Sequence, residues 1–178
     1  ESVLGNAGGV LLPEGYLADA YARVRAAGGL CIADEVQVGF GRMGTSFWGF
    51  EQSGAAPDLI TIAKPMGNGF PIGGVITSKR IADALSSQGQ FFSSAGGNPL
   101  SCRVGLAVLD AMESEGLQED ARVVGARLAD GFRALAARST ARACTSGSSW
   151  CGIANRWSPP PRKRLRSVSA CVSWVSSC

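Results

Sequence analysis

Two apolar runs that each end at a charged residue constrain this fold more than any other feature of the sequence. Residues 30–33 are followed by Asp34, and residues 59–63 are followed by Lys64. Runs rich in Ile, Leu and Ala are typical of strands buried on both faces of a parallel sheet. Ligands of such sheets bind at the carboxyl ends of the strands. The pattern therefore predicts that Asp34 and Lys64 lie at one ligand-binding edge.

Segments with helical spacing alternate with these runs. Residues 16–27 form one such segment, and two glycines follow it where a helix cap is expected. Helices are also expected at residues 81–85, 99–115 and 117–137, with a short strand at residues 74–77. The alternation predicts an α/β fold with a mostly parallel sheet and flanking helices.

The last two predicted helices each carry an apolar face that is expected to point inward. The residues of these two faces are Leu106, Leu109 and Met112 in the first helix, and Val124, Leu128, Phe132 and Leu135 in the second.

Composition narrows the classes of function. The net charge of +3 is weak evidence for a nucleic-acid partner, and no apolar stretch approaches the ~18 residues of a membrane span. We therefore expect neither a nucleic acid nor a membrane as partner. The chain has no His, so acid-base chemistry falls to Lys, Asp, Glu or a cofactor. Because the chain starts at Glu1 without an apolar leader, it is expected to be a cytoplasmic fragment that begins inside a domain.

The order of strands and helices stops after Arg138. Residues 139–178 are rich in Ser, Cys, Arg and Trp, without helical or strand periodicity. Four of the six cysteines lie there, but no pair has the spacing of a zinc site, so no metal is expected. Two interpretations stay open for this tail: a disordered segment, or a frameshifted reading of a lost domain.

A glycine-rich loop offers an alternative function. Residues 39–44 match the G-x-G-x-x-G pattern of dinucleotide sites, which binds a pyrophosphate only where it opens a helix. The next residues are aromatic and poorly helical. The sequence therefore favours tight turns beside a site, packed by Phe47, Trp48 and Phe50.

The surroundings of Lys64 favour a chemical role for this residue. Residues 65–71 form a turn rich in Gly and Pro between two apolar strands, where a backbone can approach a ligand closely. A partly desolvated lysine there would favour the neutral, nucleophilic amine. Asp34 is interpreted either as a turn cap or as a carboxylate that pairs with a cation.

Five motifs in order strongly resemble the class III aminotransferases, pyridoxal-phosphate enzymes of fold type I. The similarity is greatest to the branch that holds alanine-glyoxylate aminotransferase and ethanolamine-phosphate phospho-lyase. The motifs are Ile-Ala-Asp-Glu-Val-Gln-Val-Gly-Phe-Gly-Arg-Met-Gly at residues 32–44, Phe-Trp at 47–48, Pro-Asp at 57–58, Lys-Pro-Met-Gly-Asn-Gly at 64–69 and Gly-Gly-Asn-Pro at 96–99.

This resemblance implies a role for each of five residues. Lys64 would bind pyridoxal phosphate covalently and move protons, and Asp34 would pair with the protonated pyridine nitrogen. Val36 would pack on the ring, and Gln37 would form a hydrogen bond near the phenolic oxygen. Ser94 stands where the family has a Thr that reaches the cofactor phosphate of the neighbouring subunit, which implies a homodimer.

The resemblance also implies the domain organisation and the reaction. Residues 1–138 would be the C-terminal part of the large, cofactor-binding domain, and the tail would lie outside the family. The reaction would transfer an amino group between an amino acid and a 2-oxo acid. One alternative is a phospho-lyase that acts on an amino-alcohol phosphate, and another is a truncated, non-catalytic remnant.

Overall fold

The computed structural model describes residues 1–89 and 92–145, with residues 138–145 described by backbone alone. The chain divides into two units, and the first, Glu1–Asp130, contains every strand that the structure describes and every predicted site residue. The elements are β1 (Val3–Leu4), η1 (Gly5–Ala7), β2 (Val10–Leu11), α1 (Tyr16–Ala26), β3 (Ile32–Asp34), η2 (Gly49–Ser53), β4 (Leu59–Ile62), η3 (Lys64–Gly67), β5 (Gly74–Thr77), α2 (Lys79–Ser86), α3 (Pro99–Ser114) and α4 (Leu117–Thr145).

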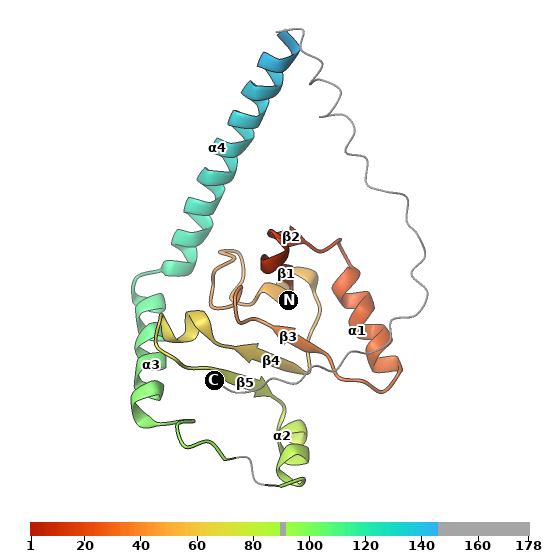
Figure 1. Ribbon diagram of the computed structural model, residues 1–178, viewed down its shortest axis with the longest axis vertical. Helices are drawn as coiled ribbons and strands as arrows, with labels where there is room; N and C mark the ends of the chain where they lie inside the picture. The colour runs from red at the N-terminus through yellow and green to blue at the C-terminus, as the bar shows by residue number, and fades with distance from the viewer. Residues whose placement is uncertain (90–91, 146–178) are drawn as a thin grey trace. The chain divides into compact units, whose positions relative to one another are not determined.

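The main sheet has three strands in the order β3-β4-β5, which Figure 1 shows side by side. β3 and β4 are parallel, as the sequence predicts, but β5 runs antiparallel to β4. The prediction of a mostly parallel sheet is therefore wrong for the described residues, whose main sheet is small and mixed. The reason lies in the connection: residues 63–73 join β4 to β5 and contain only the 3-10 turn η3, whereas a parallel neighbour is usually reached through a crossover α-helix.

The strands are less buried than their composition predicts. Ile32 is 56% exposed and Val75 is 58% exposed, so burial on both faces is wrong for this sheet. The inward orientation of the last two helices is also wrong for most of the residues named: Leu106, Leu109, Val124, Leu128, Phe132 and Leu135 are all exposed. Met112 is half-buried. Periodicity identifies the apolar face of an element, but it does not supply a second element to cover that face.

Helix α1 ends as its glycines predict. The Gly28 N–H donates to the Arg25 carbonyl and the Gly29 N–H donates to the Val24 carbonyl, which is the hydrogen-bond pattern of a Schellman cap. Gly28 adopts a φ of 79°, in the left-handed region that glycine tolerates.

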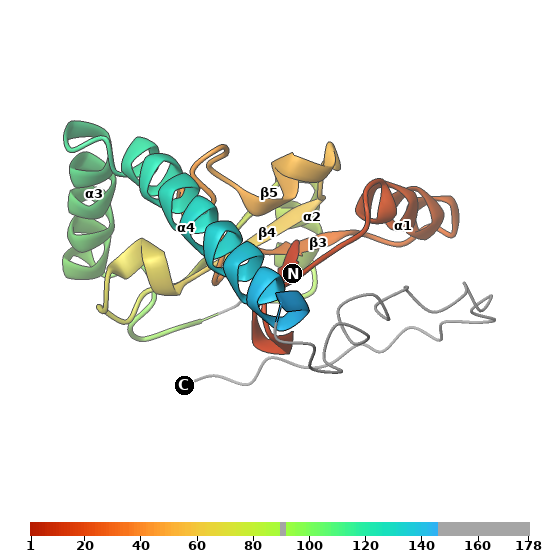
Figure 2. The same ribbon diagram turned by 90° about the horizontal axis from the view of Figure 1, so that it is seen from above.

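A small core forms where α1 meets the start of β3. Tyr21, Cys31 and Ala55 are buried together, with Leu17 packed against them. Burial raises the pKa of the Tyr21 hydroxyl and of the Cys31 thiol. In Figures 1 and 2, α1 and α3 lie on opposite sides of the three-stranded sheet.

The last helix is longer than predicted. Residues 117–137 were expected to be helical, and α4 continues to Thr145, past the predicted domain boundary at Arg138. No described helix is both long enough and apolar enough to span a membrane. The predictions for residues 146–178 lie outside the described residues.

Candidate active site

The parallel pairing of β3 and β4 places Asp34 and Lys64 at one edge of the sheet. Asp34 is the last residue of β3 and pairs in register with Thr61 of β4. β4 ends at Ile62, and after Ala63 the chain enters the 3-10 turn η3, which begins at Lys64. Both residues therefore stand at the carboxyl ends of neighbouring parallel strands, where α/β sheets bind ligands.

Lys64 contacts a second predicted site residue. Its Nζ donates to Oε1 of Gln37 at 3.5 Å, which is a long hydrogen bond. The turn beneath it is packed, because Pro65 and Gly67 are buried, but the Lys64 side chain itself is exposed. The expected partial desolvation of Lys64 is therefore wrong for the described chain.

Asp34 caps a turn with one carboxylate oxygen. Oδ1 accepts a hydrogen bond from the Val36 N–H at 3.0 Å, the turn-cap arrangement that the sequence left open. Oδ2 accepts no hydrogen bond from residues that the structure describes. Asp34, Val36 and Gln37 are all half-buried, so this side of the site is partly shielded from water and still open to a ligand.

The Gln37 side chain packs against the N-terminal segment. A Cβ atom added at Gly5 would lie 2.8 Å from Nε2 of Gln37, closer than real Cβ contacts come. A larger residue at this position would therefore displace the end of the Gln37 side chain. No local pattern marks Gly5, because it and Gln37 are far apart in the chain.

Ser94 is not brought to this group. It is exposed, and within the described residues it forms no hydrogen bond with Asp34, Gln37 or Lys64. It lies in the segment before α3, whose first turn is capped by Asn98 through a 2.9 Å bond from the Ser101 N–H. Its predicted role concerns a neighbouring subunit and stays a prediction.

Glu35 is a buried carboxylate beside the site whose importance is not visible in the sequence. It is 0% exposed, and its carboxylate accepts hydrogen bonds from the Gly49 N–H at 2.7 Å, the Phe50 N–H at 3.0 Å and the Ser2 hydroxyl at 3.1 Å. An acidic residue next to the predicted anchor Asp34 was visible in the sequence. Its donors were not, because two of them are backbone groups 14 and 15 residues away.

The glycine-rich loop does not form a dinucleotide site. No α-helix follows residues 39–44; the next element is the 3-10 helix η2. Gly44 has a φ of 74°, and a Cβ there would lie 2.6 Å from Cα of Arg122 in α4. The predicted aromatic packing is confirmed: the rings of Phe47 and Trp48 meet edge to face, with their centroids 4.7 Å apart. The loop glycines serve tight turns and close packing.

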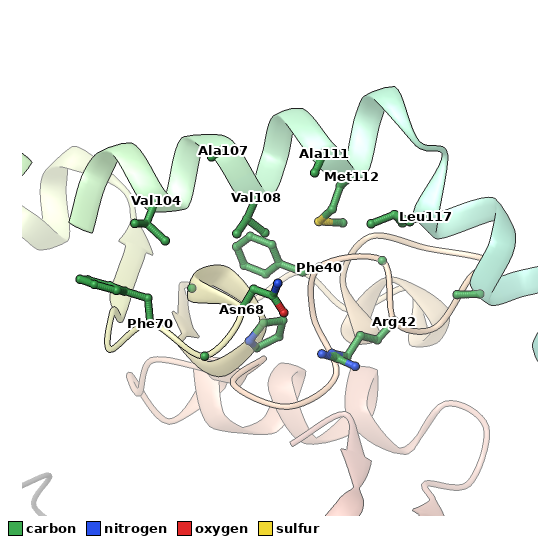
Figure 3. Close-up of a pocket in the computed structure, with 15 residues that line it drawn as sticks. Phe40, Arg42, Asn68, Phe70, Val104, Ala107, Val108, Ala111, Met112 and Leu117 are labelled. Carbon is green, nitrogen blue, oxygen red and sulfur yellow. The ribbon is translucent and has the colours of Figure 1, made fainter. Parts of the chain in front are cut away.

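A pocket of about 860 Å³ lies beside the loop; Pro65 and Gly67 line it, but Lys64 and Asp34 do not. Figure 3 shows Val104, Val108 and Met112 of α3 on one side, facing Phe40 and Asn68. Its lining is mainly apolar. The pocket therefore does not mark the predicted chemistry, which stands at the sheet edge.

Comparisons with known proteins show what this chain is similar to. A family profile described as Aminotransferase class-III matches residues 1–145. The chain is 50% identical to "Alanine--glyoxylate aminotransferase 2-like" of Drosophila melanogaster over 126 residues, which cover 70% of this chain and 26% of that protein. It is also 50% identical to human "Alanine--glyoxylate aminotransferase 2, mitochondrial" over 125 residues, 70% of this chain and 24% of that protein. The chain thus spans about a quarter of the length of these relatives.

Solved structures show the same similarity. A phospholyase from Arthrobacter in complex with phosphoethanolamine superposes with a TM-score of 0.71 at 44% identity, over 74% of this chain and 31% of that chain. The ornithine aminotransferase of Toxoplasma gondii, described with partial occupancy of PLP at its active site, superposes with a TM-score of 0.69 at 31% identity, over 74% of this chain and 31% of that one. The described fold is thus a segment of a larger α/β enzyme fold.

Proposed function

Because this chain belongs to the class III aminotransferase family, we propose that it carries the lysine segment of a pyridoxal-phosphate-dependent transaminase. The full-length enzyme transfers an amino group between an amino acid and a 2-oxo acid. One observation carries the proposal: Asp34 ends β3, Lys64 begins the turn just after the parallel strand β4, and the Lys64 amine contacts Gln37 at this edge.

The residues at the edge fit the cofactor that this family uses. Lys64 offers an exposed primary amine, Asp34 offers a carboxylate oxygen without a partner among the described residues, and Gln37 offers an amide. An amine, an anion and a neutral hydrogen-bonding group match the aldehyde, the protonated ring nitrogen and the phenolic oxygen of pyridoxal phosphate. When bound, this cofactor withdraws electrons from the carbon that loses its proton.

Each side chain then has a defined task. Lys64 binds the cofactor through Nζ and moves a proton at that atom. Asp34 holds the ring nitrogen in its protonated form, and Gln37 orients Nζ through the hydrogen bond already present. Val36, half-buried beside Asp34, packs on the ring. Ser94 binds the phosphate of a partner subunit, so the full-length enzyme works as a homodimer on small-molecule substrates.

A phospho-lyase that acts on an amino-alcohol phosphate is the second candidate. The similarity to the Arthrobacter phospholyase, at 44% identity, favours it. Such an enzyme uses the same lysine and releases phosphate instead of transferring nitrogen. Measurement of 2-oxo acid consumption beside phosphate release by the full-length enzyme separates the two reactions.

The third candidate is a non-catalytic remnant. The exposed apolar faces of α3 and α4 favour it, because an incomplete domain leaves its core surface open to water.

Localisation in the cytoplasm also stays a prediction, since the similar human protein is named as mitochondrial.

Covalent trapping at Lys64 tests the proposal. Incubation of the chain with pyridoxal phosphate, reduction with borohydride and peptide mass spectrometry should place the cofactor mass on Lys64. Lys79 of α2 is the matched control, because it is also exposed but lies away from the sheet edge in an ion pair with Asp83. We expect the modified fraction at Lys64 to exceed that at Lys79 by about tenfold, the effect of a positioned amine relative to a free one.

Two variants complete the test. Lys79→Ala should leave the trapping at Lys64 unchanged, and Lys64→Ala should leave only the background level at other amines. Equal modification of the two lysines in the wild-type chain would contradict the proposed function and favour the remnant.

A further inference from the structure

The proposed chemistry does not use the most deeply buried ionisable side chain near the site. Glu35 is 0% exposed, and the ion pairs among the described residues do not include it. A buried carboxylate is costly unless its lone pairs are satisfied. Here two backbone N–H groups and one hydroxyl satisfy it. The arrangement is specific, because these donors come from separate segments.

The main chain of Glu35 adds two further links. Its N–H donates to the Thr61 carbonyl of β4 at 3.0 Å, and its carbonyl accepts from the Gly39 N–H at 3.1 Å. The space around the carboxylate is full: a Cβ at Gly49 would lie 2.4 Å from the Ser2 hydroxyl oxygen. Glu35 therefore joins β4, the loop that follows β3 and the N-terminal segment at one point.

Gln37 lies between two segments that Glu35 holds. On one side is its own loop, fixed by the bond from Gly39 to the Glu35 carbonyl. On the other is the N-terminal segment, where a Cβ added at Gly5 would lie 2.8 Å from Nε2 of Gln37 and Ser2 donates to the Glu35 carboxylate. With both sides fixed, the Gln37 amide presents its oxygen to Lys64 at 3.5 Å.

We propose that Glu35 is a positioning residue that holds Gln37 against Lys64 by fixing the loop of residues 36–50 to the N-terminal segment of residues 2–5. It acts through Gln37 and does not touch the cofactor. The inference deepens the proposed function and rests on it, because the contact matters for catalysis only if Lys64 is the reacting amine. The contact itself can be tested without any cofactor.

The test measures how accessible the Lys64 amine is in the full 178-residue chain. Brief acetylation with acetic anhydride, followed by peptide mass spectrometry, gives the ratio of modification at Lys64 to that at Lys79. The variants are Glu35→Gln, Gln37→Ala and the double variant. Glu51→Gln is the matched control, because Glu51 also accepts a backbone N–H in the same loop, from Trp48 at 2.9 Å, but is exposed.

Glu35→Gln should raise the ratio about threefold, the size expected when one weak hydrogen bond to Lys64 is lost. Gln37→Ala should raise it equally, and the double variant no further, because both changes remove the same contact. Glu51→Gln should leave it unchanged. A wild-type ratio in Glu35→Gln overturns the inference. So does a double variant whose ratio equals the product of the two single effects.

A gentler variant keeps the test decisive if Glu35→Gln does not fold by circular dichroism. Ser2→Ala removes one donor and retains the carboxylate, so it should also raise the ratio of acetylation at Lys64 to that at Lys79. In a chain that carries Gln37→Ala, the Ser2→Ala change should have no further effect. An unchanged ratio in Ser2→Ala overturns the inference. Failure of the proposed function has a different result. In that case borohydride traps no cofactor at Lys64 of the wild-type chain, while the acetylation ratios of the variants still change as expected.

Discussion

Adjacent acidic residues show how much depends on environment at the scale of single residues. Asp34 and Glu35 follow one another at the end of β3, yet Asp34 is half-buried with one oxygen free of described partners, whereas Glu35 is fully buried and accepts three hydrogen bonds. The first is available to a ligand. The second is committed to the fold, so a structural and a functional carboxylate can be distinguished by their donors.

Asp58 makes a testable contribution to stability at the same scale. Its carboxylate accepts the Cys31 N–H at 2.8 Å and two bonds from Arg25, and these interactions hold its pKa below the ordinary 3.8. A lowered folded-state pKa stabilises the fold fully above the ordinary carboxyl pKa, and this stabilisation is lost as the pH falls through the folded value.

We therefore expect the midpoint temperature of thermal unfolding to fall between neutral pH and about pH 3. The fall should be larger in the wild-type chain than in Asp58→Asn. Circular dichroism melts across this range measure the effect. Asp83→Asn is the control, since its pair with Lys79 is exposed and contributes little. Parallel curves for wild type and Asp58→Asn would show that Asp58 does not carry this pH dependence.

Replacement of glycine by alanine is expected to change the stability of the chain in opposite directions at two positions. Gly28 ends α1 with a φ of 79°, and Gly125 lies within α4; a Cβ at either position would meet nothing within 4 Å. Steric contacts therefore play no part at either site. The backbone conformation alone decides whether alanine is tolerated.

This pair yields a prediction of opposite sign. Gly28→Ala should destabilise the chain by about 1 kcal/mol, because an L-residue is strained in the left-handed region. Gly125→Ala should stabilise it by about 0.5–1 kcal/mol, because glycine is a poor helix former. Urea unfolding of the two variants measures both changes, and a shift of the same sign in both would refute the argument.

Within the residues that the structure describes, many large apolar side chains are exposed. Val124, Leu128 and Phe132 are spaced for one side of α4 and are 53%, 57% and 67% exposed. The family relatives are about four times longer than the matched segment, so the chain is a segment of a larger fold. Exposed apolar surface of this kind favours association.

Leu128→Gln should lower both the fluorescence of a bound apolar dye and the fraction of associated chain in size-exclusion chromatography. The helix should persist, because exposed positions tolerate substitution within about 0.5 kcal/mol. Leu85→Gln is the control: Leu85 of α2 is 65% exposed but lies outside this helix face. An equal loss of dye binding in both variants would show that the α4 face is not the principal association surface.

The sequence by itself determined the four α-helices and the three strands of the main sheet that the structure describes, the α/β class and the family, although not every boundary. The pattern of residues 30–34 and 58–64 also predicted the sheet edge that Asp34 and Lys64 share. These features depend on short-range periodicity, glycine conformation and motif order, all of which can be read locally.

Only the tertiary structure decided which groups meet. The antiparallel β5, the exposed helix faces, the contact between Gln37 and Lys64, and the three donors of Glu35 all depend on segments distant in the chain. Ser2 and Glu35 are 33 residues apart, and no local pattern pairs a hydroxyl with a carboxylate over that distance. Burial and hydrogen bonding are properties of the packed chain, whereas strand and helix propensities are properties of its segments.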